Sequence, residues 1–311
     1  MGSIQGSGCA VFPSETRVPR KSPLPARGAR WVLAIVGAWV LSAGAGFANA
    51  ATITKASTSR ADREAAQREM PLAELTPQAR QRIQRVLDKP SLYRRMPVSL
   101  VECDQQLYRF LVRHPEVVVN IWQLMGITKV NAKRVGPYQL DAEDGAGTVT
   151  NIELVYGNQD THLFYCEGKY DGPLFSRPLT GRCVLLLKSG YKEQADRTCS
   201  TTSRMDVFLQ IDNVAIDAVT RTLHPLLGKS ADLNFIESTK FVERISQTSA
   251  ENGPGMVRLA SRLDKVDEEV RQEFATITSQ VFAKARGEEE TEAARTAQLD
   301  APLNAPANQR R

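Results

Sequence analysis

A change in hydrophobic period near Gly126 is the feature that most constrains the fold of this chain. Before this glycine, apolar residues recur at the spacing of three and four that helices show, whereas from Ile127 to Ile211 they alternate with a period of two. The connections between these strand segments are too short to hold a crossover helix, so neighbouring strands must be antiparallel. The sequence therefore predicts an α+β domain built on an antiparallel sheet.

About seven strands are expected, the first of them short and separated from the others by two helices. Gly136-Pro137 and the segment from Gly157 to Asp160 supply turn residues between strands. The expected strands cover residues 98–101, 127–133, 138–142, 149–156, 161–170, 182–189 and 198–211.

Helices are expected on both sides of this run of strands. Asp104 is a suitable N-cap for a first short helix, and His114-Pro115-Glu116 is typical of the start of a second. After the strands, Asp212 or Asn213 can cap a long helix, which Pro225 should kink or break, and Gly228 likewise.

The order of these elements resembles the helix-grip layout of the START-like (SRPBCC) ligand-binding superfamily. In that layout a curved antiparallel sheet grips a long C-terminal helix, and an apolar cavity lies between them. The resemblance covers residues 97–248 and depends on element order rather than on a residue motif. Because members include lipid carriers and polyketide cyclases, the resemblance does not choose between binding and catalysis.

The resemblance implies that one face of the sheet and one face of the long helix form the cavity wall. Strand residues alternate between faces, so Val184 and Leu186 are the alternative to Leu185 and Leu187 on their strand. A filled core would use the same residue types. The candidate ligand-binding residues are Ile152, Leu154, Tyr156, Leu185, Leu187, Val207, Leu209, Ile216, Val219 and Leu223.

The first fifty residues have the pattern of an export signal. Basic residues precede an uncharged apolar run from Trp31 to Phe47, and Ala48-Asn49-Ala50 is a small-x-small cleavage site. Cleavage between Ala50 and Ala51 is expected, which predicts an exported protein that is periplasmic or secreted. The alternative is an uncleaved anchor, although the run is shorter than the ~20 residues that a membrane-spanning helix needs.

Composition divides the remainder of the chain into four parts. Residues 51–96 are expected to form a flexible polar spacer and then a short helical region, ahead of the domain at residues 97–248. A helical extension is expected over residues 249–287, with a linker at residues 252–255 near its start. Residues 288–311 are expected to be a disordered tail.

The helical extension carries a seam of apolar residues with nearly heptad spacing. This pattern predicts pairing with a helical partner or with a second copy of the chain. One or two helices packed on the core would show the same pattern. The seam consists of Leu259, Leu263, Val266, Val270, Phe274, Ile277 and Val281.

Net charge gives little support for nucleic-acid binding. The chain carries +5, of which the five basic residues and one acidic residue of the first fifty account for +4. The mature chain therefore has a net charge of only about +1, so no nucleic-acid partner is expected.

Four cysteines follow the leader, at positions 103, 166, 183 and 199. Four cysteines allow three disulfide pairings, and an exported protein can keep disulfides. The spacing is not that of a recognised disulfide framework, and buried free thiols are the other interpretation.

No catalytic motif is complete. His114 and His224 suit structural roles, and the three histidines do not form a cluster of metal ligands. His162, with Asp160 or Asp206, is the best candidate for a general base. No catalytic residue, metal site or cofactor is therefore predicted.

Three functions are consistent with these observations. The first is an exported protein that binds a hydrophobic small molecule or lipid in the sheet–helix cavity, without catalysis. The second is a cell-envelope interaction protein that acts through its C-terminal helix. The third is a cavity enzyme of cyclase or hydrolase type.

Overall fold

One antiparallel sheet of nine strands forms the centre of the structure, a computed structural model that describes residues 51–173, 177–193, 199–212 and 216–299. The strands follow the order β1-β3-β9-β8-β7-β6-β5-β4, and β2 pairs with β9 on the same edge as β3. The predicted α+β class is confirmed. The strands are β1 (Ala51–Thr54), β2 (Leu92–Arg95), β3 (Val98–Glu102), β4 (Asn131–Gly136), β5 (Gln139–Glu143), β6 (Thr148–Gly157), β7 (Thr161–Tyr170), β8 (Leu179–Glu193) and β9 (Cys199–Ile211).

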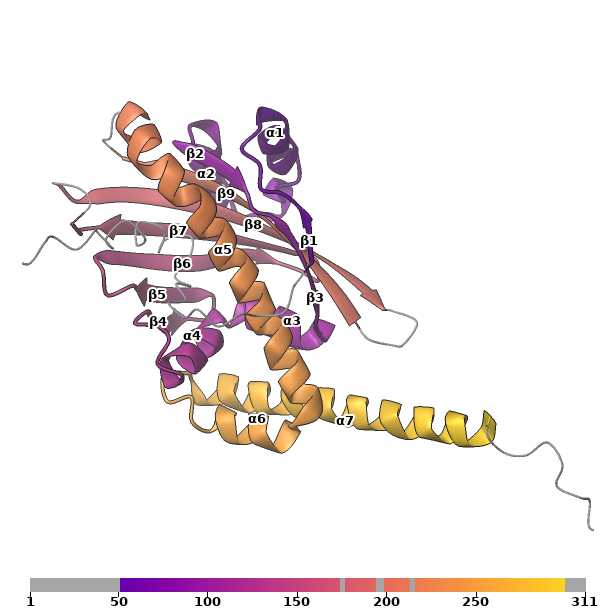
Figure 1. The fold of residues 1–311 in the computed structure, drawn as a ribbon. Helices are drawn as coiled ribbons and strands as arrows, with labels where there is room; N and C mark the ends of the chain where they lie inside the picture. Colours follow the sequence, from indigo (N-terminus) through magenta and orange to yellow (C-terminus); the bar gives the residue numbers. More distant parts are fainter. Residues whose placement is uncertain (1–50, 174–176, 194–198, 213–215, 300–311) are drawn as a thin grey trace, which may run out of the picture.

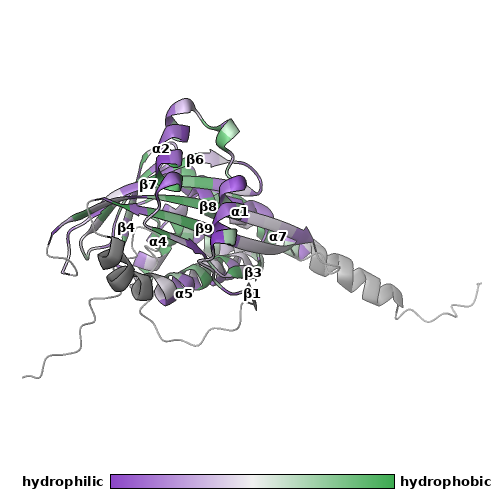
Figure 2. Cartoon of the chain, turned by 90° about the horizontal axis from the view of Figure 1, so that it is seen from above, coloured by the Kyte–Doolittle hydropathy of each residue, from purple (hydrophilic) through white to green (hydrophobic). Residues whose placement is uncertain are grey.

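Helices lie on both faces of this sheet (Figure 1). The long helix α5 crosses one face, called the inner face below, whereas α1 and α2 pack on the opposite, outer face. In Figure 2 the hydrophobic residues of β7 and β8 lie between these two helical layers. The helices are α1 (Arg60–Arg68), the 3-10 turn η2 (Leu72–Glu74), α2 (Pro77–Asp88), α3 (Gln105–Arg113), α4 (Pro115–Leu124), α5 (Ile216–Glu251), α6 (Gly253–Ala260) and α7 (Glu268–Leu299).

Strand register decides which side chains reach each face. Phe164 of β7 pairs with Leu154 of β6 and with Leu185 of β8, and all three belong to the apolar cluster of the inner face. Tyr165, one residue later, pairs with Val184 and packs in the cluster under α2. Because both faces of the central strands are apolar, both must be covered by helices.

Polar contacts fix α5 on the inner face. Arg94 of β2 donates from two nitrogens to the carboxylate of Asp232, at 2.8 and 2.5 Å. The hydroxyls of Ser99 and Thr239 are 2.7 Å apart and buried. These contacts set the position of the helix relative to the strand edge.

The predicted break in this helix is wrong. α5 is continuous from Ile216 to Glu251, through Pro225 and Gly228. A proline removes one hydrogen bond from a helix, and the packing of the rest of this long helix on the sheet compensates for that loss. Asp212 binds Arg182 at 2.8 Å rather than starting the helix, and Asn213 lies outside the described residues.

The prediction of a flexible spacer after the leader is also wrong. Residues of β1 pair with β3, and α1 is capped by Ser59, whose hydroxyl accepts the backbone N–H of Asp62 at 3.1 Å. The polar residues that suggested a spacer make caps and ion pairs with distant strands. Such long-range partners leave no trace in local composition.

The C-terminal extension forms two helices that pack on the domain. Asn252, expected in a linker, instead caps α6 and accepts the N–H of Gly255 at 3.0 Å. Seam residues from Leu263 to Val281 are buried in one cluster with α3, α4 and α5, so this seam is packed on the core. Since Glu and Ala favour helix, α7 continues to Leu299, and the expectation of disorder from residue 288 is wrong up to there.

Candidate ligand-binding site

The inner face gathers most of the predicted cavity residues that the structure describes. The apolar cluster there includes five of them, together with Phe164 and Phe235. Leu187 pairs with His162 and with Met205, which places it further along the same face. Val184 and Leu186 lie on the outer face, so the register favours the odd-numbered set on β8. The five are Ile152, Leu154, Leu185, Val207 and Leu209.

Three predicted cavity residues cannot be placed. Ile216, Val219 and Leu223 belong to the first turns of α5, and their side chains lie outside the described part of the chain. Their assignment to the cavity wall therefore stays a prediction.

A β-bulge changes the direction of Tyr156. Leu154 pairs with Phe164, but the next paired residue is Tyr156, opposite Leu163, so Val155 is the extra residue. An extra residue reverses the alternation of side chains beyond it. Tyr156 therefore does not share the face of Ile152 and Leu154, and it contacts the cluster under α2, but it still lines the pocket that opens beside the bulge.

A pocket of about 430 Å³ opens beside this bulge. Ile152, Leu154 and Phe164 form its apolar floor, and all but the phenylalanine are only half-buried. Leu140 and Tyr138 of the β4–β5 hairpin form another side. Volumes of this size are within the range of small-molecule sites, which are mostly apolar with a few polar groups.

The polar groups at this pocket come from the α3–α4 junction and from β4. Arg134 binds both carboxylate oxygens of Glu116, at 2.7 and 3.0 Å, and His114 Nδ1 lies 3.2 Å from the same carboxylate. Glu116 is 2% exposed. Burial alone would raise the pKa of Glu116, but the hydrogen bonds from His114 and Arg134 hold it below its ordinary value. Glu116 therefore fixes Arg134 in place and neutralises it.

Arg113 supplies a positive charge that is not neutralised in this way. Its Nε donates to His162 Nε2 at 3.3 Å, and its Nη2 donates to the carbonyl oxygen of Asn158 at 3.1 Å. Among the described residues, no carboxylate lies within ion-pair distance of Arg113, which is exposed and lines the pocket. The pocket therefore combines an apolar floor with one excess positive charge at its rim.

His162 is held neutral beneath this arginine. Its side chain is 0% exposed, and burial together with the charges of Arg113 and Arg109 lowers its pKa to about 4. Nε2 accepts from Arg113, so Nδ1 carries the hydrogen, and this buried donor has no partner among the described groups. With its basic nitrogen occupied, His162 positions Arg113 and is a poor proton acceptor.

Neither aspartate proposed beside His162 forms a dyad with it. Asp206 is on the outer face, since its neighbour Met205 shares the inner face with Leu187 and His162. Asp160 accepts from the hydroxyl of Thr161 at 2.5 Å. The prediction of a His–Asp general base is therefore wrong for Asp206, and no hydrogen bond between the described atoms of Asp160 and His162 supports the other pair.

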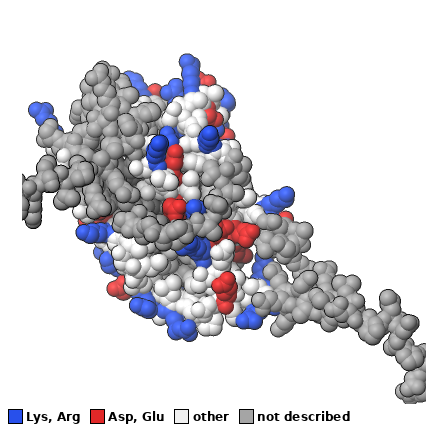
Figure 3. Space-filling model, in the orientation of Figure 1, with Lys and Arg blue, Asp and Glu red and all other residues white. Residues whose placement is uncertain are grey.

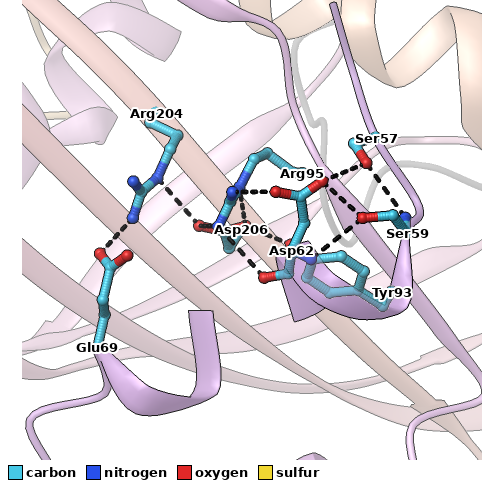
Figure 4. A network of polar contacts seen from close by, with 8 residues as sticks. All are labelled: Ser57, Ser59, Asp62, Glu69, Tyr93, Arg95, Arg204 and Asp206. Carbon is cyan, nitrogen blue, oxygen red and sulfur yellow. Dashed lines mark hydrogen bonds and ion pairs between the residues drawn. The ribbon is translucent and has the colours of Figure 1, made fainter. Parts of the chain in front are cut away.

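The outer face contains a polar cluster centred on Asp206 (Figure 4). This carboxylate is 0% exposed and accepts from the hydroxyl of Tyr93 at 2.6 Å and from Arg95 Nε at 2.8 Å. Arg204 forms an ion pair with its other oxygen at 3.3 Å. Burial and the hydrogen bond to Asp206 raise the pKa of Tyr93 well above its ordinary value. The carboxylate thus has its partners within the protein.

The same cluster ties α1 to the sheet (Figure 4). Arg95 Nη1 donates to Asp62 of α1 at 2.5 Å, and Ser57 and Ser59 donate to the other oxygen of Asp62 at 2.6 and 2.7 Å. These two hydroxyls, with the charge of Arg95, lower the pKa of Asp62. Glu69 pairs with Arg204. This arrangement is a structural lock rather than a site open to a ligand.

Among the described residues, neither the charges on the face drawn in Figure 3 nor the metal-ligand geometry gives another candidate. In the view of Figure 3, basic and acidic side chains of the described residues are interspersed. No group of three His, Cys, Asp or Glu side chains within the described ranges is arranged to hold a metal ion. None of the described helices combines the length and the apolarity needed to cross a bilayer.

Sequence reasoning missed the residues that make the pocket polar. Arg113, Arg134 and Tyr138 were not candidates, because a lone arginine or tyrosine in a sequence has no pattern that distinguishes it. Phe164 could have been found, since it lies opposite Leu154 and Leu185 in the predicted hairpins.

Comparisons with known proteins give only distant similarity. No protein-family profile and no curated protein sequence matches the chain. Among solved structures, it is similar to apo dicamba monooxygenase (16% identity, TM-score 0.28, 68% of this chain and 60% of that chain). The same enzyme bound to dicamba gives 15% identity, a TM-score of 0.27 and coverage of 67% and 62%. The di-domain ARO/CYC BexL from the BE-7585A biosynthetic pathway gives 14% identity and a TM-score of 0.23, and the match covers 50% of this chain and 52% of that chain.

This chain therefore spans only about half to three fifths of the length of those proteins. TM-scores this low carry no argument about residues or reactions.

Proposed function

We propose that this chain is an exported, START-like binding protein for an amphipathic small molecule or lipid with an apolar body and an anionic end. The observation that carries the proposal is the pocket at the bulge of β6. Its floor is apolar and half-exposed, and Arg113 at its rim has no acidic partner among the described residues.

The apolar body would lie against Ile152, Leu154 and Phe164. Burying apolar surface there would contribute about 25 cal/mol for each Å² removed from water. The anionic end would meet Arg113, which His162 and the carbonyl of Asn158 hold in position from below. No covalent step is needed for this function.

Export is part of the proposal and is supported by the leader pattern. Mass spectrometry of the protein exported by a Gram-negative host should give a mature N-terminus at Ala51, and a retained leader would contradict this part.

Binding is tested with a dansyl-labelled undecanoate probe and two matched variants on β6. Leu154→Lys puts a charge on the pocket floor, whereas Val149→Lys puts the same charge on an exposed position of the same strand. Saturable probe fluorescence should persist in Val149→Lys and fall at least tenfold in affinity in Leu154→Lys. Equal affinity in both folded variants would contradict the assignment of the pocket.

The anionic end is tested separately. Arg113→Gln should weaken the carboxylate probe more than a dansyl-labelled undecanol of equal length. If both probes lose affinity equally, Arg113 does not recognise charge.

A further inference from the structure

The four cysteines after the leader form two facing pairs in the sheet. Cys166 of β7 is the direct register partner of Cys183 of β8. Cys103 follows the last residue of β3, and its backbone N–H donates to the carbonyl oxygen of Cys199 at 3.0 Å. All four are free thiols in this structure.

Backbone geometry at both pairs is compatible with a disulfide. In the register between β7 and β8, Asp160 lies opposite Ser189, and the backbone N–H of Ser189 donates to the carbonyl oxygen of Asp160. Hydrogen-bonded pairs recur at every second residue of an antiparallel ladder, so the pair of Cys166 and Cys183, six residues further along, is also a hydrogen-bonded pair. Both cysteine pairs therefore occupy hydrogen-bonded positions, where facing Cα atoms are about 5.5 Å apart. Disulfides join Cα atoms that are about 4.4–6.8 Å apart.

The sheet order excludes the other two ways of pairing four cysteines. β3 is separated from β7 by β9 and β8, a distance of about 14 Å across the sheet, so Cys103 cannot reach Cys166. Cys103 cannot reach Cys183 either, because β9 lies between β3 and β8. In addition, Cys199, the neighbour of Cys103, pairs with Glu193, which is ten residues along β8 from Cys183. Only one connectivity brings both partners together.

We propose that Cys103–Cys199 and Cys166–Cys183 are two dithiol sites that close as disulfides in the exported protein. In each, a cysteine thiolate attacks the disulfide of an oxidant, such as a thiol–disulfide oxidoreductase or oxidised glutathione, and breaks its S–S bond. The second cysteine then displaces the oxidant from the mixed disulfide. Each closure removes two electrons and two protons from the pair and leaves the oxidant as two thiols.

The two sites differ in access. Cys199 is half-buried and lines a surface pocket of about 530 Å³ with Tyr191 and Lys284, so an oxidant can reach it in the folded protein. Cys166 and Cys183 are fully buried on the inner face, in the cluster that holds Ala231 and Phe235 of α5.

The inner pair therefore closes before α5 docks, and the outer pair can close afterwards. Burial raises the pKa of Cys166 to about 12 and also raises the pKa of Cys103 and of Cys199, so the order of closure follows from access to the thiols rather than from their thiolate content.

The test is a disulfide map of the full chain exported by a Gram-negative host. The protein is alkylated with iodoacetamide under denaturing conditions, digested, and compared with and without reductant. We expect two linked peptide pairs, 103–199 and 166–183. Four alkylated cysteines, or any other linkage, would overturn the proposal.

A second arm does not depend on export. Reduced, folded protein incubated with oxidised glutathione should gain only the 103–199 disulfide, whereas protein refolded from denaturant in the same buffer should gain both. Cys103→Ala/Cys199→Ala should retain the inner disulfide, and Cys166→Ala/Cys183→Ala should retain the outer one. Refolding that yields no intramolecular disulfide, or closure of the inner pair in folded protein, would contradict the account.

Discussion

The two faces of the sheet are closed in different ways. The outer face is covered by α1 and α2, which precede the central strands, and its buried carboxylate Asp206 receives donors from Tyr93, Arg95 and Arg204. The inner face is covered by α5, and beside that helix it keeps a pocket whose rim carries the unneutralised Arg113.

This difference is the reason for assigning a structural role to the outer face and proposing a binding role for the inner face. Charges on the outer face satisfy one another, so they stabilise the protein and have little left to offer a ligand. On the inner face, the half-buried side chains of Ile152 and Leu154 line the same pocket as Arg113, whose guanidinium has no acidic partner among the described residues.

The outer cluster should be the more sensitive to loss of charge. Asp206→Asn leaves Arg95 and Arg204 without their shared buried carboxylate, and we expect the free energy of unfolding to fall by about 3–5 kcal/mol. Glu69→Gln, at the exposed end of the same cluster, should cost less than about 1 kcal/mol. Urea denaturation measures both free energies of unfolding, and equally small losses in the two variants would show that Asp206 does not hold the outer cluster together.

His162 should make stability depend on pH between its two pKa values. The unfolded side chain has a pKa near 6.5 and the folded one about 4, so in this range the unfolded state binds more protons. Lowering the pH from 6.5 to 4 should therefore reduce the free energy of unfolding by roughly 3 kcal/mol. His162→Gln should remove this part of the pH dependence, and an unchanged profile would contradict a buried neutral histidine.

Glu116 should contribute at lower pH. Its folded pKa is depressed, so its stabilising effect is present above the unfolded carboxyl pKa and is lost as the pH falls below about 4.5. Glu116→Gln at neutral pH should cost about 2 kcal/mol, because hydrogen bonds between charged groups are lost. A variant as stable as the parent protein at pH 7 would show that Arg134 does not need this partner.

The smallest effect on stability is expected at the pocket rim and at the exposed control position on β6. Val149→Lys and Arg113→Gln alter exposed side chains and should change the free energy of unfolding by less than about 0.5 kcal/mol. Thermal denaturation is the control that makes their binding data interpretable. A large loss of stability in Arg113→Gln would assign this arginine to the core instead.

The fold was predictable where a pattern repeats. Alternation placed Leu185 and Val207 on one face, and short connections required antiparallel pairing. The extra residue at Val155 was not predictable, because nothing in the local sequence marks a bulge and one residue reverses the direction of Tyr156.

Elements held by distant contacts were harder to predict. Strands β1 and β2 and helix α1 depend on partners more than thirty residues away, such as the ion pair between Asp62 and Arg95. The residues that make the pocket polar come from three separate elements. The four cysteines are the clearest case, since their spacing allows three pairings and only the strand order selects one.

Native mass spectrometry of the exported protein tests directly whether the inner face binds a ligand. We predict a bound mass of an amphipathic anionic molecule that is released on denaturation, present in Val149→Lys and absent in Leu154→Lys. A folded parent protein that carries no such mass and also fails to bind the dansyl undecanoate probe would contradict the claim that the inner face is a ligand site.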